Sequence, residues 1–164
     1  MKRNIFFRPE RCLLCLSCVL ACQRQSLREE PGKDPRPRLR ATFSGGTPWV
    51  WKCQQCTAAP CVEACISGSL RPREDGTGTE HSPENCVGCG SCLLACPLGI
   101  PAPEADSHRF SRCRLCLEEE TPPCVKVCQS GALVFEEAGR FARTKMKRYA
   151  LTAEKAERAE KNAK

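Results

Sequence analysis

Short runs of apolar residues, rather than long periodic stretches, mark the predicted elements of this 164-residue chain. Residues 4–7 (NIFF) and 132–135 (ALVF) are rich in β-branched and aromatic side chains, which favour strands. Residues 47–52 (TPWVWK) predict a third strand with Trp49 and Trp51 on one face, because alternate side chains along a strand point the same way. Two interpretations of these tryptophans stay open: a buried shield over a site, or a surface for a partner or an electron exit.

Two polar segments separate the apolar runs. Residues 28–40 (REEPGKDPRPRLR) are charged and rich in proline, which predicts a solvated loop or an arm that docks on another protein. Residues 71–84 (RPREDGTGTEHSPE) predict a polar hairpin or loop.

The C-terminal sequence KMKRYALTAEKAERAEKNAK predicts a helix. We expect Thr152 to be its N-cap, with the ion pairs Glu154–Arg158 and Glu157–Lys161 along it. Because it has few large apolar residues, it is either a solvated helix or a strut laid on a neighbouring subunit or copy. We therefore divide the chain into a domain of residues 1–142 and a helical extension of residues 143–164.

The composition indicates that something other than an apolar core holds this chain together. It has 16 cysteines but only 5% aromatic residues. The N-terminal apolar run, residues 5–7, is too short for a signal sequence or a membrane span, and no twin-arginine leader precedes it. We therefore expect a cytoplasmic chain without a membrane span, whose reduced thiols bind metal.

The cysteines form four groups with none left over. Every group opens with C-x2-C and closes with C-x3-C, and only the middle gap changes, so the chain contains an internal repeat. The groups are Cys12, Cys15, Cys18 and Cys22; Cys53, Cys56, Cys61 and Cys65; Cys86, Cys89, Cys92 and Cys96; and Cys113, Cys116, Cys124 and Cys128.

The repeat continues beyond the thiols. Glycines that follow the last cysteine of the three later groups predict a helix end or a turn with positive φ, and they are Gly68, Gly99 and Gly131. Gln25 stands at this place in the first group. Slightly further on, we expect strands to begin at Leu70, Ile100 and Leu133.

The spacing C-x2-C-x2-C-x3-C is typical of a [4Fe–4S] site, and residues 86–97 match it together with the proline that follows. Three cysteines so close together wrap one cubane, while the fourth ligates the other cluster of a pair. We therefore expect Cys22 to serve a different site from Cys12, Cys15 and Cys18. Zinc is the alternative, but four-cysteine zinc sites use two separated C-x2-C pairs. The predicted cofactors are four [4Fe–4S] clusters.

The formal charge of +7 counts every thiol as neutral. Four clusters of about −2 each, thiolates included, would bring the loaded protein to about −1. The basic residues then compensate the clusters locally, and we predict no nucleic-acid partner, since no aromatic and basic stripe is present.

With these four groups, and with the stretched middles CQQCTAAPCVEAC and CRLCLEEETPPCVKVC, residues 3–140 resemble the four-cluster ferredoxin-like electron-transfer subunits of multisubunit oxidoreductases. Such subunits serve dimethyl sulfoxide reductase-type molybdenum enzymes, formate hydrogenlyase and carbon monoxide dehydrogenase. The short length, the RPRLRATF segment and the helical tail also resemble the small subunit of tungsten aldehyde oxidoreductases. This resemblance implies an α+β fold of tandem bacterial-ferredoxin-like (βαβ-type) modules around the clusters.

The resemblance also implies nested pairing, the first group with the fourth and the second with the third, so that strands 4–7 and 132–135 meet as the two ends of the fold. The implied ligands are Cys12, Cys15, Cys18 and Cys128 for cluster 1; Cys113, Cys116, Cys124 and Cys22 for cluster 2; Cys53, Cys56, Cys61 and Cys96 for cluster 3; and Cys86, Cys89, Cys92 and Cys65 for cluster 4. Only Pro97 keeps the family's proline after a group; Gln23, Ile66 and Gln129 replace it elsewhere.

No catalytic constellation is visible, and His81 and His108 are not needed as ligands because the cysteine count is complete. We expect an electron-transfer subunit, not an enzyme. Its expected partner is a large catalytic subunit with tungsten or molybdenum, with a nickel enzyme, a flavin subunit or a ferredoxin as further possibilities. The alternative is a self-associating polyferredoxin that forms a conductive filament.

Overall fold

The computed structural model describes residues 3–32, 36–105 and 107–162, with the side chains of 156–162 outside that description. Its helices are α1 (Ser17–Glu29), α2 (Pro60–Glu63), α3 (Ser91–Ala95), α4 (Pro123–Lys126) and α5 (Ala138–Asn162), with 3-10 turns at Pro9–Arg11 and Pro83–Asn85. Its strands are β1 (Arg3–Phe7), β2 (Arg40–Ser44), β3 (Thr47–Trp51), β4 (Leu70–Pro72), β5 (Thr79–His81), β6 (Ala102–Pro103), β7 (Phe110–Ser111) and β8 (Leu133–Glu137).

Four antiparallel pairs of strands, β1–β8, β2–β3, β4–β5 and β6–β7, replace any large sheet. The two ends of the domain meet as predicted, since β1 pairs with β8 and places Ile5 opposite Phe135. The predicted polar hairpin is also confirmed, because β4 and β5 pair and a 3-10 turn follows. The mixture of helices and strands agrees with an α+β, ferredoxin-like fold.

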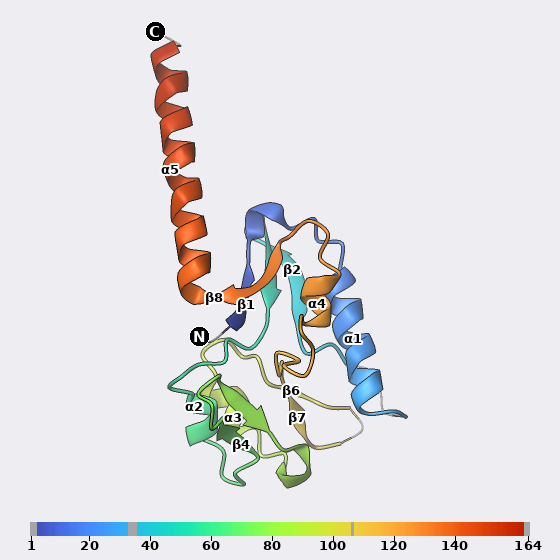
Figure 1. The fold of residues 1–164 in the computed structure, drawn as a ribbon. Coiled ribbons are helices and arrows are strands. Elements are labelled where there is room, and N and C mark those ends of the chain that lie inside the picture. Colours follow the sequence, from blue (N-terminus) through green and yellow to red (C-terminus); the bar gives the residue numbers. More distant parts are fainter. Residues whose placement is uncertain (1–2, 33–35, 106, 163–164) are drawn as a thin grey trace.

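The helices α1 to α4, each of which contains at least one cysteine of its group, pack in two pairs. Helix α1 of the first group packs on α4 of the fourth group, and α2 of the second group packs on α3 of the third. Figure 1 shows α1 and α4 in the upper half of the body and α2 and α3 in the lower half. The first pair belongs to the half that holds the apolar core, which includes Ile5, Val50 and Leu133.

The three glycines in register adopt the predicted positive φ, at 64° for Gly68, 56° for Gly99 and 65° for Gly131. Strands begin at Leu70 and Leu133 as expected. The expectation for Ile100 is wrong by two residues, because β6 begins only at Ala102.

The interpretation of the two tryptophans as a buried shield is wrong. They lie on one face of β3 and stack with ring centroids 6.1 Å apart, but Trp49 is 44% exposed and Trp51 is 40% exposed. The opposite face of the strand carries Val50, which is buried in the core. The expected loop at residues 28–40 is shorter than predicted, since α1 continues to Glu29 and β2 begins at Arg40; residues 33–35 lie outside the described part.

The C-terminal helix begins earlier than its composition indicates, at Ala138. Phe141 stacks on Phe6 with ring centroids 4.5 Å apart, and this tertiary contact anchors the first turn. Thr152 is therefore not an N-cap: it lies inside the helix, and its hydroxyl donates to the Arg148 carbonyl at 2.9 Å. The predicted pairs Glu154–Arg158 and Glu157–Lys161 involve side chains outside the described residues. Within the described part, no helix is long and apolar enough to cross a membrane.

Candidate iron–sulfur sites

The opening C-x2-C loop of every group contains a left-handed residue just before its second cysteine. These residues are Leu14 (φ 51°), Gln55 (φ 54°), Gly88 (φ 73°) and Leu115 (φ 67°). A turn that brings a left-handed residue next to right-handed neighbours points successive backbone amides into one concavity, which suits an anion such as a cluster with its thiolates. Only one of the four is glycine, so sequence reasoning missed this part of the repeat.

Serine hydroxyls lie beside one cysteine of each group, two residues after it. The Sγ–Oγ distance is 3.4 Å both for Cys15 with Ser17 and for Cys89 with Ser91. It is 3.8 Å for Cys65 with Ser67 and 3.7 Å for Cys128 with Ser130. The Ser17 contact lowers the pKa of Cys15, and the Ser91 contact lowers that of Cys89, because a hydroxyl stabilises the thiolate that a metal requires. The C-x-S pattern is visible in the sequence and could have indicated these partners.

Backbone amides reach two of the closing cysteines in the same way. The Leu70 amide donates to Cys65 Sγ at 3.4 Å, and the Leu133 amide donates to Cys128 Sγ at 3.3 Å. The first residue of each strand, β4 and β8, thus donates its backbone amide to the last cysteine of the preceding group. The Arg38 amide donates to Cys22 Sγ at 3.1 Å, which gives the first group a partner from a distant segment.

The structure brings cysteines of the first and fourth groups together. Burial raises the pKa of Cys18 to about 11, and the nearby thiols of Cys128 and Cys12 add to the rise. Burial likewise raises the pKa of Cys116 to about 12, with further contributions from Cys113 and Cys22. The last cysteine of each group therefore lies among thiols of the other group.

The second and third groups meet in the same manner. Burial raises the pKa of Cys61, the charge of Arg112 opposes the rise, and the thiols of Cys53 and Cys96 add to it. Burial raises the pKa of Cys92 to about 11, and Cys86, Cys61 and Cys65 contribute.

A cavity lies at this second junction. Its lining includes three cysteines of the third group, Cys86, Cys89 and Cys92, and the last cysteine of the second group, Cys65. Four thiol residues around one hollow fit the donor set of a [4Fe–4S] cluster. Among the residues that the structure describes, no three Cys, His, Asp or Glu side chains are placed to hold a single metal ion.

Two buried cations stand beside the second group. Arg112, only 3% exposed, donates from Nη1 to Cys53 Sγ at 3.4 Å and from Nη2 to the Glu80 carbonyl at 3.1 Å. Lys52, also 3% exposed, donates to the Cys53 carbonyl at 3.2 Å. Burial lowers the pKa of Lys52, while thiols of the second and fourth groups, Cys113 and Cys53 first, oppose that shift.

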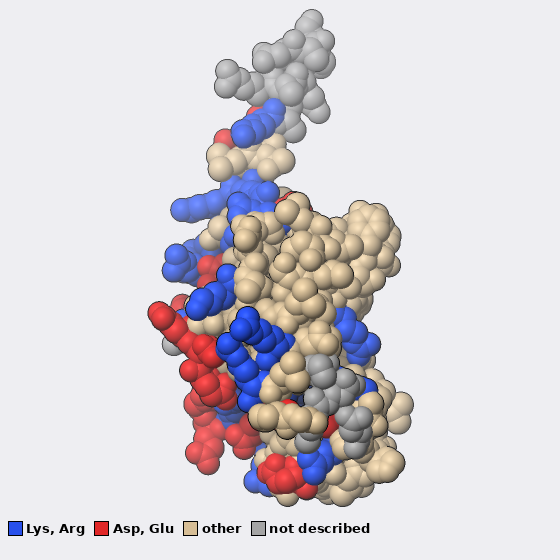
Figure 2. All heavy atoms as spheres, turned by 90° about the vertical axis from the view of Figure 1, so that its right-hand side faces the viewer, with Lys and Arg blue, Asp and Glu red and all other residues tan. Residues whose placement is uncertain are grey.

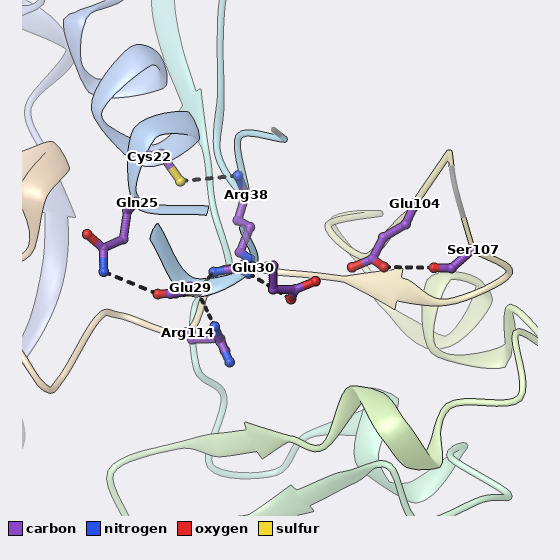
Figure 3. A network of polar contacts seen from close by, with 8 residues as sticks. All are labelled: Cys22, Gln25, Glu29, Glu30, Arg38, Glu104, Ser107 and Arg114. Carbon is purple, nitrogen blue, oxygen red and sulfur yellow. Dashed lines mark hydrogen bonds and ion pairs between the residues drawn. The ribbon is translucent and has the colours of Figure 1, made fainter. Parts of the chain in front are cut away.

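An ion-pair network stands beside Cys22 (Figure 3). Glu29 at the end of α1 contacts both Arg38 and Arg114, and Gln25 donates to it at 3.4 Å. Burial alone would raise the pKa of Glu29, but the bonds and charges of the two arginines outweigh it and leave the pKa below its usual value. The network ties α1 to the segment before β2 and to the fourth cysteine loop.

The two histidines occupy different places. His81 lines the cavity at the second junction, and burial together with the charges of Arg112 and Arg114 lowers its pKa to about 4. The His108 carbonyl presses against the loop at Gly88, where an added Cβ would lie 2.2 Å from it. That neither histidine is a ligand stays a prediction.

Comparison with known proteins supplies the family of these sites. Residues 48–138 match the 4Fe-4S dicluster domain family, which covers the second, third and fourth cysteine groups. The chain is 31% identical to the iron–sulfur subunit of nitrate-inducible formate dehydrogenase from Escherichia coli K12, over 76% of this chain and 50% of that subunit. It is 30% identical to a probable anaerobic dimethyl sulfoxide reductase chain of the same strain, over 80% of this chain and 72% of the relative.

A thiosulfate reductase electron transfer subunit from Salmonella typhi is 26% identical, over 85% of this chain and 77% of the relative. The chain thus spans only about half the length of the formate dehydrogenase subunit that it matches. By their names, the formate dehydrogenase relative is an iron–sulfur subunit and the thiosulfate reductase relative is an electron transfer subunit.

Proposed function

The chain belongs to the 4Fe-4S dicluster domain family, and on that premise we propose that it is the electron-transfer subunit of an oxidoreductase complex, with four [4Fe–4S] clusters and no catalysis of its own. The observation that carries this proposal is the packing of the groups in pairs: α1 packs on α4, α2 packs on α3, and Cys65 lines a cavity with the third group's thiols, which supports an exchange of closing cysteines.

The proposed ligands follow that exchange. Cluster 1 is held by Cys12, Cys15, Cys18 and Cys128; cluster 2 by Cys113, Cys116, Cys124 and Cys22; cluster 3 by Cys53, Cys56, Cys61 and Cys96; and cluster 4 by Cys86, Cys89, Cys92 and Cys65. These ligands lie within residues 1–142, and residues 143–164 form an extension.

The chain's own residues set the conditions of transfer. A bound [4Fe–4S] cluster takes up and releases one electron at a time. The left-handed loops point amides inward, the serine hydroxyls stabilise the thiolates, and the buried cations Lys52 and Arg112 offset negative charge. Burial of Cys113 and Cys124 excludes water from the second site.

The proposed partner is a large catalytic subunit in the cytoplasm that carries molybdenum or tungsten, of which a tungsten aldehyde oxidoreductase is our preferred candidate. The relatives' names point to formate, dimethyl sulfoxide and thiosulfate enzymes, which supports a catalytic partner of the molybdenum class. A flavin subunit or a ferredoxin would exchange electrons at the other end.

Anaerobic purification through a tag on this chain, with assays of iron, sulfide and partner metals, tests the proposal. We expect about sixteen irons and as much sulfide per chain, four per cluster. Cys89→Ser should lose about four of these irons, whereas Ser44→Ala, in the remote β2–β3 hairpin, should lose none. Zinc without sulfide would refute the cluster assignment, and nickel in a companion protein would replace molybdenum or tungsten as the partner's metal.

A self-associating polyferredoxin is the second candidate. It is favoured by α5, which projects from the body in Figure 1 and exposes Met146 (70%), Tyr149 (66%) and Leu151 (58%). Light scattering of the purified full chain separates the two: a filament requires mass that grows with concentration and falls in a Met146→Glu, Tyr149→Glu variant. A monomeric mass that does not change with concentration would rule out the filament and leave the electron-transfer subunit as the proposed function.

A further inference from the structure

An open groove runs between α1 and α4 and is lined by residues of both helices. Its walls include Leu20, Arg24 and Arg28 from α1 and Lys126, Val127 and Gln129 from α4 and the residues after it. The proposed function does not use this groove.

The groove is positively charged and carries no acidic side chain in its lining. Arg24, Arg28 and Lys126 are exposed, and within the described ranges none of the three has a carboxylate at ion-pair distance. By contrast, Arg38 and Arg114 nearby are held by Glu29. Figure 2 views the molecule from the α1 side and shows Lys and Arg side chains on this face, between Asp and Glu side chains along one edge and a broad area without charged residues.

One end of the groove reaches the thiols proposed for cluster 1. Ser17 and Gln129 line it, and they lie two residues from Cys15 and one residue from Cys128. Cys15 is exposed, and apolar side chains surround this edge: Leu13 is 77% exposed and Leu20 is 63% exposed. A protein seated in the groove would therefore contact the most accessible edge of that site.

Resting on the proposed function, we infer that this groove binds an acidic electron-carrying protein, which exchanges electrons through the site of Cys12, Cys15, Cys18 and Cys128. Transient electron-transfer interfaces are small, and complementary charge at their rim speeds the encounter. Three unpaired cations around a small apolar area beside an exposed thiol provide that arrangement. The positive charge is local, because the loaded protein as a whole is close to neutral.

The test uses the cluster-loaded full chain and two variants with the same change of charge. Arg24→Glu with Arg28→Glu reverses the groove, and Arg143→Glu with Lys147→Glu makes the matched change on α5, which extends away from it in Figure 1. The probe is a purified acidic two-cluster ferredoxin. Its affinity is measured by calorimetry and its electron exchange by stopped flow at rising salt, with previously reduced lumiflavin, a small molecule, as a second reductant.

We expect the groove variant to lose at least about tenfold in affinity for the ferredoxin, equal to about 1.4 kcal/mol, and to lose the salt dependence of the rate. The α5 variant should behave as the parent chain, and lumiflavin should reduce all three at one rate. Equal loss in both variants, or no loss in either, would overturn the inference.

Two further outcomes would also overturn it: tighter binding of a single-stranded RNA oligonucleotide than of the ferredoxin, or a dimer that forms through the groove and dissociates in the groove variant. Iron and sulfide are measured on every sample, so a chain without clusters counts against the proposed function, and a loaded chain without ferredoxin binding counts against the groove alone.

Discussion

The Arg112 guanidinium donates from Nη1 to Cys53 Sγ at 3.4 Å, across 59 residues of sequence. Within the described part of the chain no carboxylate forms an ion pair with Arg112, so its charge acts on the thiols around it. The two arginines near Cys22, in contrast, are paired with two carboxylates, Glu29 and Glu30. The second cysteine group therefore has the more positive surroundings.

Replacing Arg112 should lower one reduction potential and leave the others nearly unchanged. A buried positive charge favours the reduced, more negative form of a cluster, so Arg112→Gln should shift the potential at Cys53 downward, on the order of tens of millivolts. Redox titration followed by electron paramagnetic resonance measures the shift. Arg112→Lys should restore most of it, and Arg71→Gln, on the exposed β4, should have no effect. An upward shift, or equal shifts in all clusters, would contradict this account.

Gly88→Ala should damage the third cysteine loop far more than Gly68→Ala. Both glycines have positive φ, which costs an alanine about 1–2 kcal/mol. At Gly88 the added Cβ would also lie 2.2 Å from the His108 carbonyl, whereas nothing lies within 4 Å at Gly68. We expect the Gly88→Ala chain to lose about four irons and the Gly68→Ala chain to keep them, as measured by iron per chain. If both variants keep the same amount of iron, the His108 segment moves away from the added Cβ and the prediction is wrong.

The left-handed loops show what the sequence could and could not predict. Gly68, Gly99 and Gly131 were predicted because glycine is the residue that marks positive φ. Leu14, Gln55 and Leu115 adopt the same conformation, but their residue types do not mark it in the sequence. The same limit applies to the candidate sites. Cysteine spacing indicates the four groups, but Arg112 donates to Cys53 from 59 residues away, and no local sequence pattern connects the two residues.

The start of α5 depends on a tertiary contact for the same reason. The sequence predicts a helix in the C-terminal twenty residues with Thr152 as its N-cap, but the helix begins at Ala138, where Phe141 stacks on Phe6. Phe141→Ala should therefore destabilise the domain by about 1–3 kcal/mol, through lost apolar burial and the lost aromatic pair. Thermal unfolding measures this loss. Tyr149→Ala, at an exposed position on the same helix, should change the unfolding temperature little.

Glu29→Gln should destabilise the chain near neutral pH and matter less in acid. The pKa of Glu29 is below its usual value in the folded chain, so the ionised carboxylate stabilises the fold above the pKa of an unfolded glutamate. That contribution disappears as the pH falls through the lowered folded pKa, since the proton removes the charge that holds Arg38 and Arg114. At neutral pH we expect a loss of about 1.5–3 kcal/mol, the range for hydrogen bonds to charged groups.

The measurement is the difference in unfolding free energy between the parent chain and the variant, taken across this pH range. Using the difference cancels the acid sensitivity that both chains share through their thiol sites. Glu137→Gln, on β8, should show no such pH dependence and serves as the control. A difference that stays constant as the pH falls would contradict this account, because protonated Glu29 carries no charge and has nearly the same shape as glutamine.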